Sequence, residues 1–161
     1  MGLTLRRRRL CFATAAWLWH PGRVDALLDP HLDALIDSYY AAIESQRFPD
    51  WLATLSANVV VHEPAGSLPA EGHAGAGEAW KVLTAPFRAL SFERSKSFSS
   101  GSGIAVLWSC RARGVNGASA AAEGITVFEF DDEGLIETVV SYWDPAALLI
   151  ELAEGEDEPL H

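Results

Sequence analysis

After Pro30, apolar residues recur every three or four positions, which predicts an amphipathic helix. The apolar stripe consists of Leu32, Leu35, Ile36, Tyr39 and Ile43. Pro30 suits the first helical turn, because the backbone N–H that proline lacks is not used there. Two shorter helices are expected after this one. The first begins near Pro49, and the second covers Gly77–Leu83 with Trp80 on its inner side.

From Ser91 onward the apolar pattern changes to a period of two, the spacing of strands that bury one face. Three of the expected strands are Phe92–Ser99, Ala120–Phe130 and Ile136–Tyr142. A fourth lies after the first of them, where more polar residues alternate with Ile104, Val106, Trp108, Cys110 and Ala112. Asn116-Gly117 is typical of a tight hairpin. Asp144-Pro145 predicts the start of a last helix. Helices followed by long antiparallel strands indicate an α+β fold, a curved sheet with helices packed on one face.

The segment between the first helices and these strands contains the candidate catalytic residue. Val59–Glu63 is expected to be a strand that Pro64 ends, so Glu63 shares a face with Val59 and Val61. If the valines face the interior, the carboxylate stands at the end of an apolar wall. Loss of water there would raise its pKa and make it a proton acceptor near neutral pH. A surface glutamate at a strand end is the alternative.

The chain is acidic and of single-domain length. It has 161 residues, 49% of them hydrophobic, and a formal charge of −10. Arg6–Arg9 contribute +4, so the remaining residues carry −10 − 4 = −14. A body of that charge repels nucleic acids and anionic membranes, and we expect neither as a partner. The two cysteines and five histidines show no metal-binding spacing, so no metal and no cofactor are expected.

Residues 1–23 differ from the rest of the chain. Arginines followed by the apolar run LCFATAAWLW imitate a secretory signal, but no small-residue cleavage site follows at the right place. We therefore expect a leader in 1–23 that is disordered or signal-like, a folded domain in 24–152 and an acidic tail in 153–161. A cytoplasmic location is predicted, with export as the alternative.

Two stretches resemble a known family. VHEPAGSLPAEG, residues 61–72, is similar to a segment of the ketosteroid isomerases. FEFDDEGLIETVVSYWDPAAL, residues 128–148, resembles their final hairpin and closing tail. The chain thus resembles the SnoaL-like and ketosteroid isomerase-like domains of the nuclear transport factor two superfamily over about residues 30–150. The resemblance implies a cone-shaped curved sheet packed against three N-terminal helices.

The resemblance also implies roles for particular residues. The catalytic aspartate of the isomerases falls on Glu63, their oxyanion-hole tyrosine on Tyr39 and their second oxyanion donor, an aspartic acid, on Thr126. Aromatic residues of the substrate pocket fall on Trp143 and Trp80. Glutamate in place of aspartate and threonine in place of an acid are departures from the isomerases. They weaken the case for steroid isomerisation itself.

The side-chain pattern agrees with part of this assignment. Tyr39 lies on the apolar stripe of its helix and points inward, whereas Tyr40 is expected to face away. Thr126 shares a strand face with Phe128, and Trp108 belongs to the inward set of its own strand. We therefore add Phe128 and Trp108 to the expected substrate-binding residues. The alternative for each of these residues is an ordinary place in the core.

Three functions follow from these residues. The first is an acid/base enzyme in which Glu63 moves a proton and Tyr39 steadies an oxyanion. Isomerase, polyketide cyclase and epoxide hydrolase chemistry all fit such a site, and the substrate would be an apolar, ring-containing molecule such as a steroid or polyketide. The second is a non-catalytic module that binds an apolar ligand. The third is a partner-binding protein like the transport factor that names the superfamily. A homodimer formed through the sheet is also expected.

Overall fold

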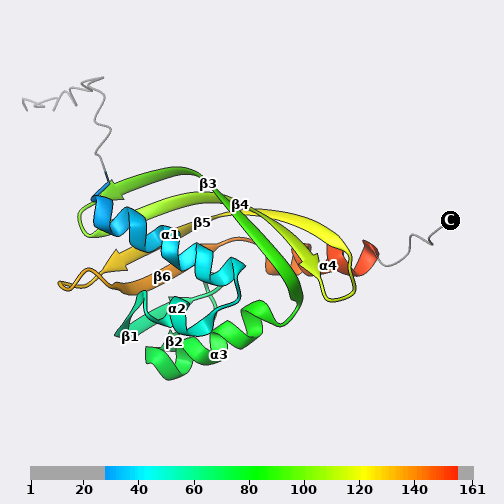
Figure 1. Ribbon diagram of the computed structural model, residues 1–161, viewed down its shortest axis with the longest axis horizontal. Coiled ribbons are helices and arrows are strands. Elements are labelled where there is room, and N and C mark those ends of the chain that lie inside the picture. Colours follow the sequence, from blue (N-terminus) through cyan, green and yellow to red (C-terminus); the bar gives the residue numbers. More distant parts are fainter. Residues whose placement is uncertain (1–27, 156–161) are drawn as a thin grey trace, which may run out of the picture.

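The computed structural model describes residues 28–155, which form one curved sheet with helices against it (Figure 1). The elements in chain order are α1 (Pro30–Glu44), α2 (Phe48–Leu52), β1 (Leu55–His62), β2 (Ala70–Glu71), α3 (Gly72–Thr84), β3 (Phe87–Ser100), β4 (Gly103–Gly114), β5 (Ser119–Phe130), β6 (Ile136–Tyr142) and α4 (Pro145–Glu154). The predicted α+β class with three N-terminal helices is confirmed. The predicted leader, residues 1–23, lies outside the described residues.

The sheet has six strands in the order β2-β1-β6-β5-β4-β3. The long strands β3, β4 and β5 curve over α1, while β1, β2, α2 and α3 lie together at one end (Figure 1). This curvature leaves one concave face, and the buried side chains of the strands point into it. The large side chains that are fully buried in the core include Phe128, Val106 and Val139 of the strands and Trp51 of α2.

Local sequence signals fix several boundaries. Asp29 caps α1, because its Oδ1 accepts from the His31 backbone N–H over 2.9 Å. Asp144 caps α4 in the same way, accepting from the Ala147 N–H over 3.0 Å. Gly117 has a φ of 91° in the turn between β4 and β5, a conformation that glycine adopts without strain. The predicted starts of α1 and α4 and the hairpin at Asn116-Gly117 are therefore confirmed.

Several boundaries and one strand pairing differ from the sequence prediction. Strand β1 begins at Leu55 rather than Val59 and ends at His62, one residue before Glu63. Strand β3 begins at Phe87 rather than Phe92.

The sheet is mixed rather than wholly antiparallel, because β1 pairs in parallel with β6, with Val61 opposite Val139. Between β1 and β6 the chain passes through β2, α3, β3, β4 and β5, so no local pattern reveals this pairing. Helix α3 also begins at Gly72, five residues before the predicted start, although glycine disfavours helix interiors.

The predictions for two core residues, Cys110 and Trp80, are borne out. Cys110 is a buried free cysteine within the apolar cluster. Trp80 faces inward from α3 and packs against Trp51, with ring centroids 5.1 Å apart. Within residues 28–155, no helix is long and apolar enough to cross a membrane.

Candidate active site

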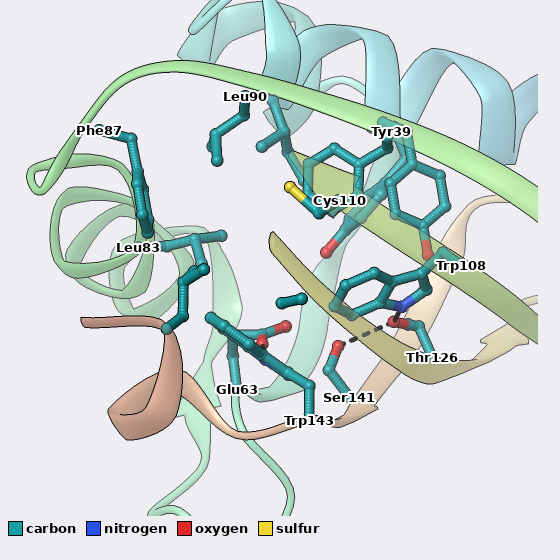
Figure 2. A pocket seen from close by; sticks show the side chains of 15 residues that line it. Tyr39, Glu63, Leu83, Phe87, Leu90, Trp108, Cys110, Thr126, Ser141 and Trp143 are labelled. Atoms are coloured by element: carbon teal, nitrogen blue, oxygen red, sulfur yellow. Dashed lines mark hydrogen bonds between the residues drawn. The ribbon is translucent and has the colours of Figure 1, made fainter. Parts of the chain in front are cut away.

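Glu63 follows β1 directly, at the point where the chain leaves the sheet. Val59 and Val61 are buried on the core side of that strand, so the wall that leads to the carboxylate is apolar as expected. Trp143, which lies between β6 and α4, donates its indole Nε1–H to Glu63 Oε1. Glu63 and Trp143 meet at the floor of the pocket in Figure 2.

The environment of Glu63 favours its neutral form. Burial raises the pKa of this carboxyl above its ordinary value of 4.5, and hydrogen bonding by Ser141 and Trp143 opposes the rise. The residue as a whole is only partly buried, but its carboxylate end lies in the pocket. No lysine, arginine or histidine of the described chain lines that pocket, so no cation offsets the loss of water. A carboxyl with a raised pKa can accept and return protons near neutral pH.

A line of polar side chains runs beside the carboxylate. Trp108 Nε1–H donates to Thr126 Oγ1 over 2.9 Å, and Thr126 Oγ1 lies 3.0 Å from Ser141 Oγ (Figure 2). Because Thr126 accepts from Trp108, its own proton is available to Ser141, which in turn can donate to Glu63. Thr126 and Ser141 are both buried on the concave face. The Thr126 hydroxyl is thus engaged with its neighbours, and its role as an oxyanion donor stays a prediction.

Both tyrosines of α1 reach the same space. Tyr39 is buried, and burial followed by the nearby charge of Glu63 raises its pKa well above the ordinary value. The prediction that Tyr40 faces away is wrong. Tyr40 is buried against Phe92 and Phe128, with ring centroids 5.1 and 6.2 Å away. The curved strands contact α1 over more than one helical stripe, so neighbouring positions are both covered.

The space that these groups share, which we call the inner pocket, is small. Its cavity volume is about 40 Å³, enough for a few water molecules. Tyr39, Tyr40, Glu63, Trp108, Thr126, Ser141 and Trp143 supply its chemistry. Aliphatic and aromatic side chains complete its walls, among them Ile43, Leu83, Phe87, Leu90, Phe92 and Leu148. Leu83, Phe87 and Leu90 lie at the end of the pocket opposite Thr126 in Figure 2.

A second and larger space, the outer cleft, lies on the other side of Glu63. Its cavity volume is about 680 Å³. The loop of residues 64–69, α3 and the start of α4 form its walls. Glu63, Leu83, Phe87 and Trp143 line both spaces, so the carboxylate stands on their shared boundary.

The structure brings some of the predicted site residues together, but not all of them. Glu63, Tyr39, Thr126, Trp108 and Trp143 come together at the inner pocket. Trp80 and Phe128 lie outside its lining. Trp80 packs against Phe48 and Trp51 in the core, and Phe128 lies beneath the tyrosines with its ring 5.1 Å from that of Tyr39.

Sequence reasoning missed two polar residues of the site, Ser141 and Tyr40. For Ser141 a signal existed, since the alternation of β6 puts it on the same face as Val139. For Tyr40 there was none, because its burial depends on how the distant strands curve over α1.

Comparisons with known proteins agree with this architecture. A sequence profile of the SnoaL-like domain matches residues 36–139, more than half of the chain. A comparison with curated proteins gives no significant match. Among solved structures, the chain is similar to a Δ5-3-ketosteroid isomerase from Mycobacterium sp., with a TM-score of 0.62, 24% identity and coverage of 71% of this chain and 93% of the isomerase.

Two other solved structures are similar to this chain. RV0760c from Mycobacterium tuberculosis, solved in complex with estradiol-17β-hemisuccinate, has a TM-score of 0.63 and 20% identity, covering 71% of this chain and 95% of that protein. The epoxide hydrolase/cyclase-like enzyme SalBIII, of pyran ring formation in salinomycin, has a TM-score of 0.63 and 16% identity, covering 71% and 91%. At these identities the similarity establishes the fold alone. Together with the match over residues 36–139, it shows that the chain belongs to the SnoaL-like domain family.

Proposed function

We propose that this protein is an acid/base enzyme that acts on an apolar, ring-containing small molecule, with Glu63 as the group that moves the proton. The observation that carries the proposal is the setting of this carboxylate. It lies on the boundary of two largely apolar spaces, its pKa is raised by burial, and two neutral hydrogen-bond donors hold it. Such a carboxylate has both the basicity and the access to substrate that proton transfer requires.

In the proposed reaction, the ionised Glu63 takes a proton from a carbon next to a carbonyl group. The electron pair of the broken C–H bond moves into an enolate, whose oxygen accepts a hydrogen bond from a tyrosine hydroxyl of α1, the family position being Tyr39. Glu63 then returns the proton to another carbon of the same molecule, so the substrate is isomerised. Opening of an epoxide by water would use the same carboxylate to take the proton of the water. The neighbouring isomerase and epoxide hydrolase/cyclase-like structures support both reactions as candidates.

The experiment is turnover of a β,γ-unsaturated steroid ketone by the full chain, followed by the ultraviolet absorption of the conjugated product. Glu63→Gln keeps the shape of the side chain but removes its basicity, so we expect at least a 100-fold loss of kcat. Glu137→Gln, on the exposed part of β6, is the matched control and should keep the parent rate. Equal activity of the Glu63→Gln variant would contradict the assignment. If the ketone is not turned over at all, the same pair of variants is assayed with an apolar cyclic epoxide.

A second candidate is a binding module without catalysis. The observation in its favour is that the Thr126 hydroxyl, at the position of the isomerases' acid, is occupied by Trp108 and Ser141. In that case apolar ring compounds would raise the melting temperature of the protein, and none of them would be converted. Ligand stabilisation that is equal in the parent and in Glu63→Gln, without turnover, would favour this reading.

The homodimer expected from the sequence also remains a proposal. Neighbouring strands place Leu107 opposite Ile125, and Ile125 opposite Tyr142, on the face of the sheet away from α1. Their exposures are 36%, 42% and 57%, and a second copy of the chain would cover this row. Ile125→Glu should convert the dimer into a monomer in light-scattering measurements. A parent protein that is monomeric at micromolar concentration would contradict the proposal.

A further inference from the structure

The space that can hold the body of a ring-containing ligand is the outer cleft. The inner pocket has a volume of only about 40 Å³. Sites for drug-sized molecules measure roughly 300–1,000 Å³. The outer cleft, with about 680 Å³, lies within that range and has Glu63 on its boundary. The rings of a substrate of the proposed enzyme therefore lie in the outer cleft.

The walls of this cleft carry apolar side chains that are exposed to water. Leu68 of the loop after β1 is 93% exposed, Val82 of α3 77% and Leu149 of α4 45%. All three line the cleft. Apolar groups that converge on one concavity from three separate elements indicate a surface that an apolar ligand body covers.

Every charged residue that lines the cleft is acidic. Glu63 stands on the boundary with the inner pocket, and α3 contributes Glu78 together with Glu71, the residue that precedes its first turn. No lysine, arginine or histidine within residues 28–155 lines the cleft. Carboxylates beside an apolar cavity attract cations and repel anions, because the weakly polarisable walls concentrate their electric field.

These carboxylates have few positive partners in the protein itself. Among the ion pairs of the described chain, only one includes any of the three, with Lys81 Nζ 2.8 Å from Glu78 Oε1. Both side chains of that pair are exposed, so it is weak. Glu63 is held by neutral donors, Trp143 and Ser141. Most of the negative charge of the cleft is therefore available to a positively charged ligand.

We propose that the outer cleft selects a ligand with an apolar ring body and a protonated amine, whose positive charge lies beside Glu71 and Glu78. Leu83 lines both spaces, as Glu63 does, and it lies about 7.5 Å from Glu78 along the axis of α3. A body of two or more fused rings spans that distance, so the amine and the reacting carbons occupy opposite ends of the ligand. The inference rests on the proposed function and adds to it the charge class of the substrate.

Three probes with the same naphthalene body test the proposal by binding alone. They are 2-(aminomethyl)naphthalene, a cation at neutral pH, 2-naphthalenemethanol, its neutral counterpart, and 2-naphthoate, an anion. Dissociation constants are measured with the full chain by equilibrium dialysis. In low salt we expect the amine to bind about 5- to 10-fold more tightly than the alcohol, as two exposed ion pairs permit, and the naphthoate to bind more weakly than the alcohol. Salt at about 0.3 M should remove most of this preference and hardly change the affinity of the alcohol.

Charge-neutralising variants identify the residues responsible. Glu71→Gln combined with Glu78→Gln should reduce the preference to about 2-fold or less while the alcohol binds as before. Glu133→Gln combined with Glu137→Gln removes two exposed carboxylates outside the cleft and should keep the preference. Lys81→Gln should increase the preference, because it leaves Glu78 without its partner.

A filling variant identifies the space. Ala79→Phe places a large ring in the cleft and should weaken all three probes at least 10-fold. If this variant binds the probes normally but changes the oligomeric state in light scattering, the cleft is an interface with a second copy of the chain and the proposal is wrong.

Three further results would overturn the proposal: equal affinity of the parent for the amine and the alcohol, a preference that survives the loss of both α3 carboxylates, or an equal loss in the control variant. Failure to bind any of the probes counts against it as well. Glu63 is unchanged in all of these variants and no turnover is measured. The charge preference can therefore fail while Glu63 remains the proton carrier, and full activity of Glu63→Gln would contradict the proposed function without affecting the preference.

Discussion

Replacing Trp143 with phenylalanine tests the electrostatics of the site without knowledge of the substrate. The change removes the indole N–H that donates to Glu63 Oε1 and keeps an aromatic ring in the wall of the pocket. The donor stabilises the ionised carboxylate, because hydrogen bonding by Trp143 opposes the rise in the Glu63 pKa that burial causes. Its loss should raise that pKa further.

The sign of the pH dependence follows from this shift. The folded-state pKa of Glu63 lies above its ordinary value of 4.5, so the folded protein holds the proton more tightly than the unfolded chain. Stability therefore falls as pH rises from 4.5 through the folded-state pKa, and it stays lower above that window. In Trp143→Phe the fall extends to higher pH. In Glu63→Gln this contribution is absent at every pH.

A hydrogen bond to a charged group contributes about 1.5–3 kcal/mol, and partial exposure of Glu63 favours the lower end. At pH 8 we therefore expect an interaction of about 1.5 kcal/mol between the two side chains. At pH 4, where the carboxyl is mostly neutral in both states, about 0.5 kcal/mol should remain. In a domain of this size 1.5 kcal/mol corresponds to roughly 3 to 6 °C in Tm.

The assay is urea unfolding of the parent, Trp143→Phe, Glu63→Gln and the double variant at pH 4 and pH 8. These four proteins form a double-mutant cycle. The destabilisation caused by the smaller ring cancels in the interaction energy, because the ring is replaced both with and without the carboxylate. An interaction energy that is the same at both pH values would refute the reasoning, since it would show that Trp143 does not discriminate the charged form of Glu63.

Three further changes have defined outcomes. Asp144→Ala should cost about 1 kcal/mol in urea unfolding, because it removes the cap that accepts from the Ala147 N–H, and Asp144→Asn should retain most of that stability. Gly124→Ala should cost about 1–3 kcal/mol and weaken ligand binding, since the added Cβ would lie 2.6 Å from Cζ2 of Trp108; a neutral substitution would contradict the packing of that indole. Thr126→Val should cost about 1–3 kcal/mol because it leaves the buried Trp108 N–H without an acceptor, whereas Thr126→Ser should be mild.

Much of the fold could be predicted because its signals are local. The three- and four-residue spacing after Pro30, the period of two after Ser91 and the helix start at Asp144-Pro145 depend on neighbouring residues, and the structure follows them. The parallel pairing of β1 with β6 and the early start of α3 depend on tertiary contacts. Gly72 and the glycines after it suggest a loop by propensity, and packing against β1 overrides that preference.

The same distinction explains what was found of the site. Glu63 could be recognised because a carboxylate follows a run of valines, and Trp108 and Thr126 because strand alternation turns them inward. Tyr40 could not be recognised. A sequence pattern with one apolar stripe predicts one buried face of a helix, whereas the curved strands cover α1 on two sides. The division into an inner pocket and an outer cleft is also invisible in the sequence, because it depends on how far Leu90 and Phe92 fill the concave face.

That division determines what the chemistry can be. A base at the bottom of a closed cone would meet only the part of a ligand that is fully enclosed. Glu63 instead lies where a space of about 680 Å³ narrows to one of about 40 Å³. In the proposed reaction, the atoms that reach Glu63 would be those between a bulky apolar body and a small polar end of the substrate. In a ketone these are the carbons next to the carbonyl, whose protons are the acidic ones, so the shape of the cavity and the basicity of Glu63 favour the same reacting position.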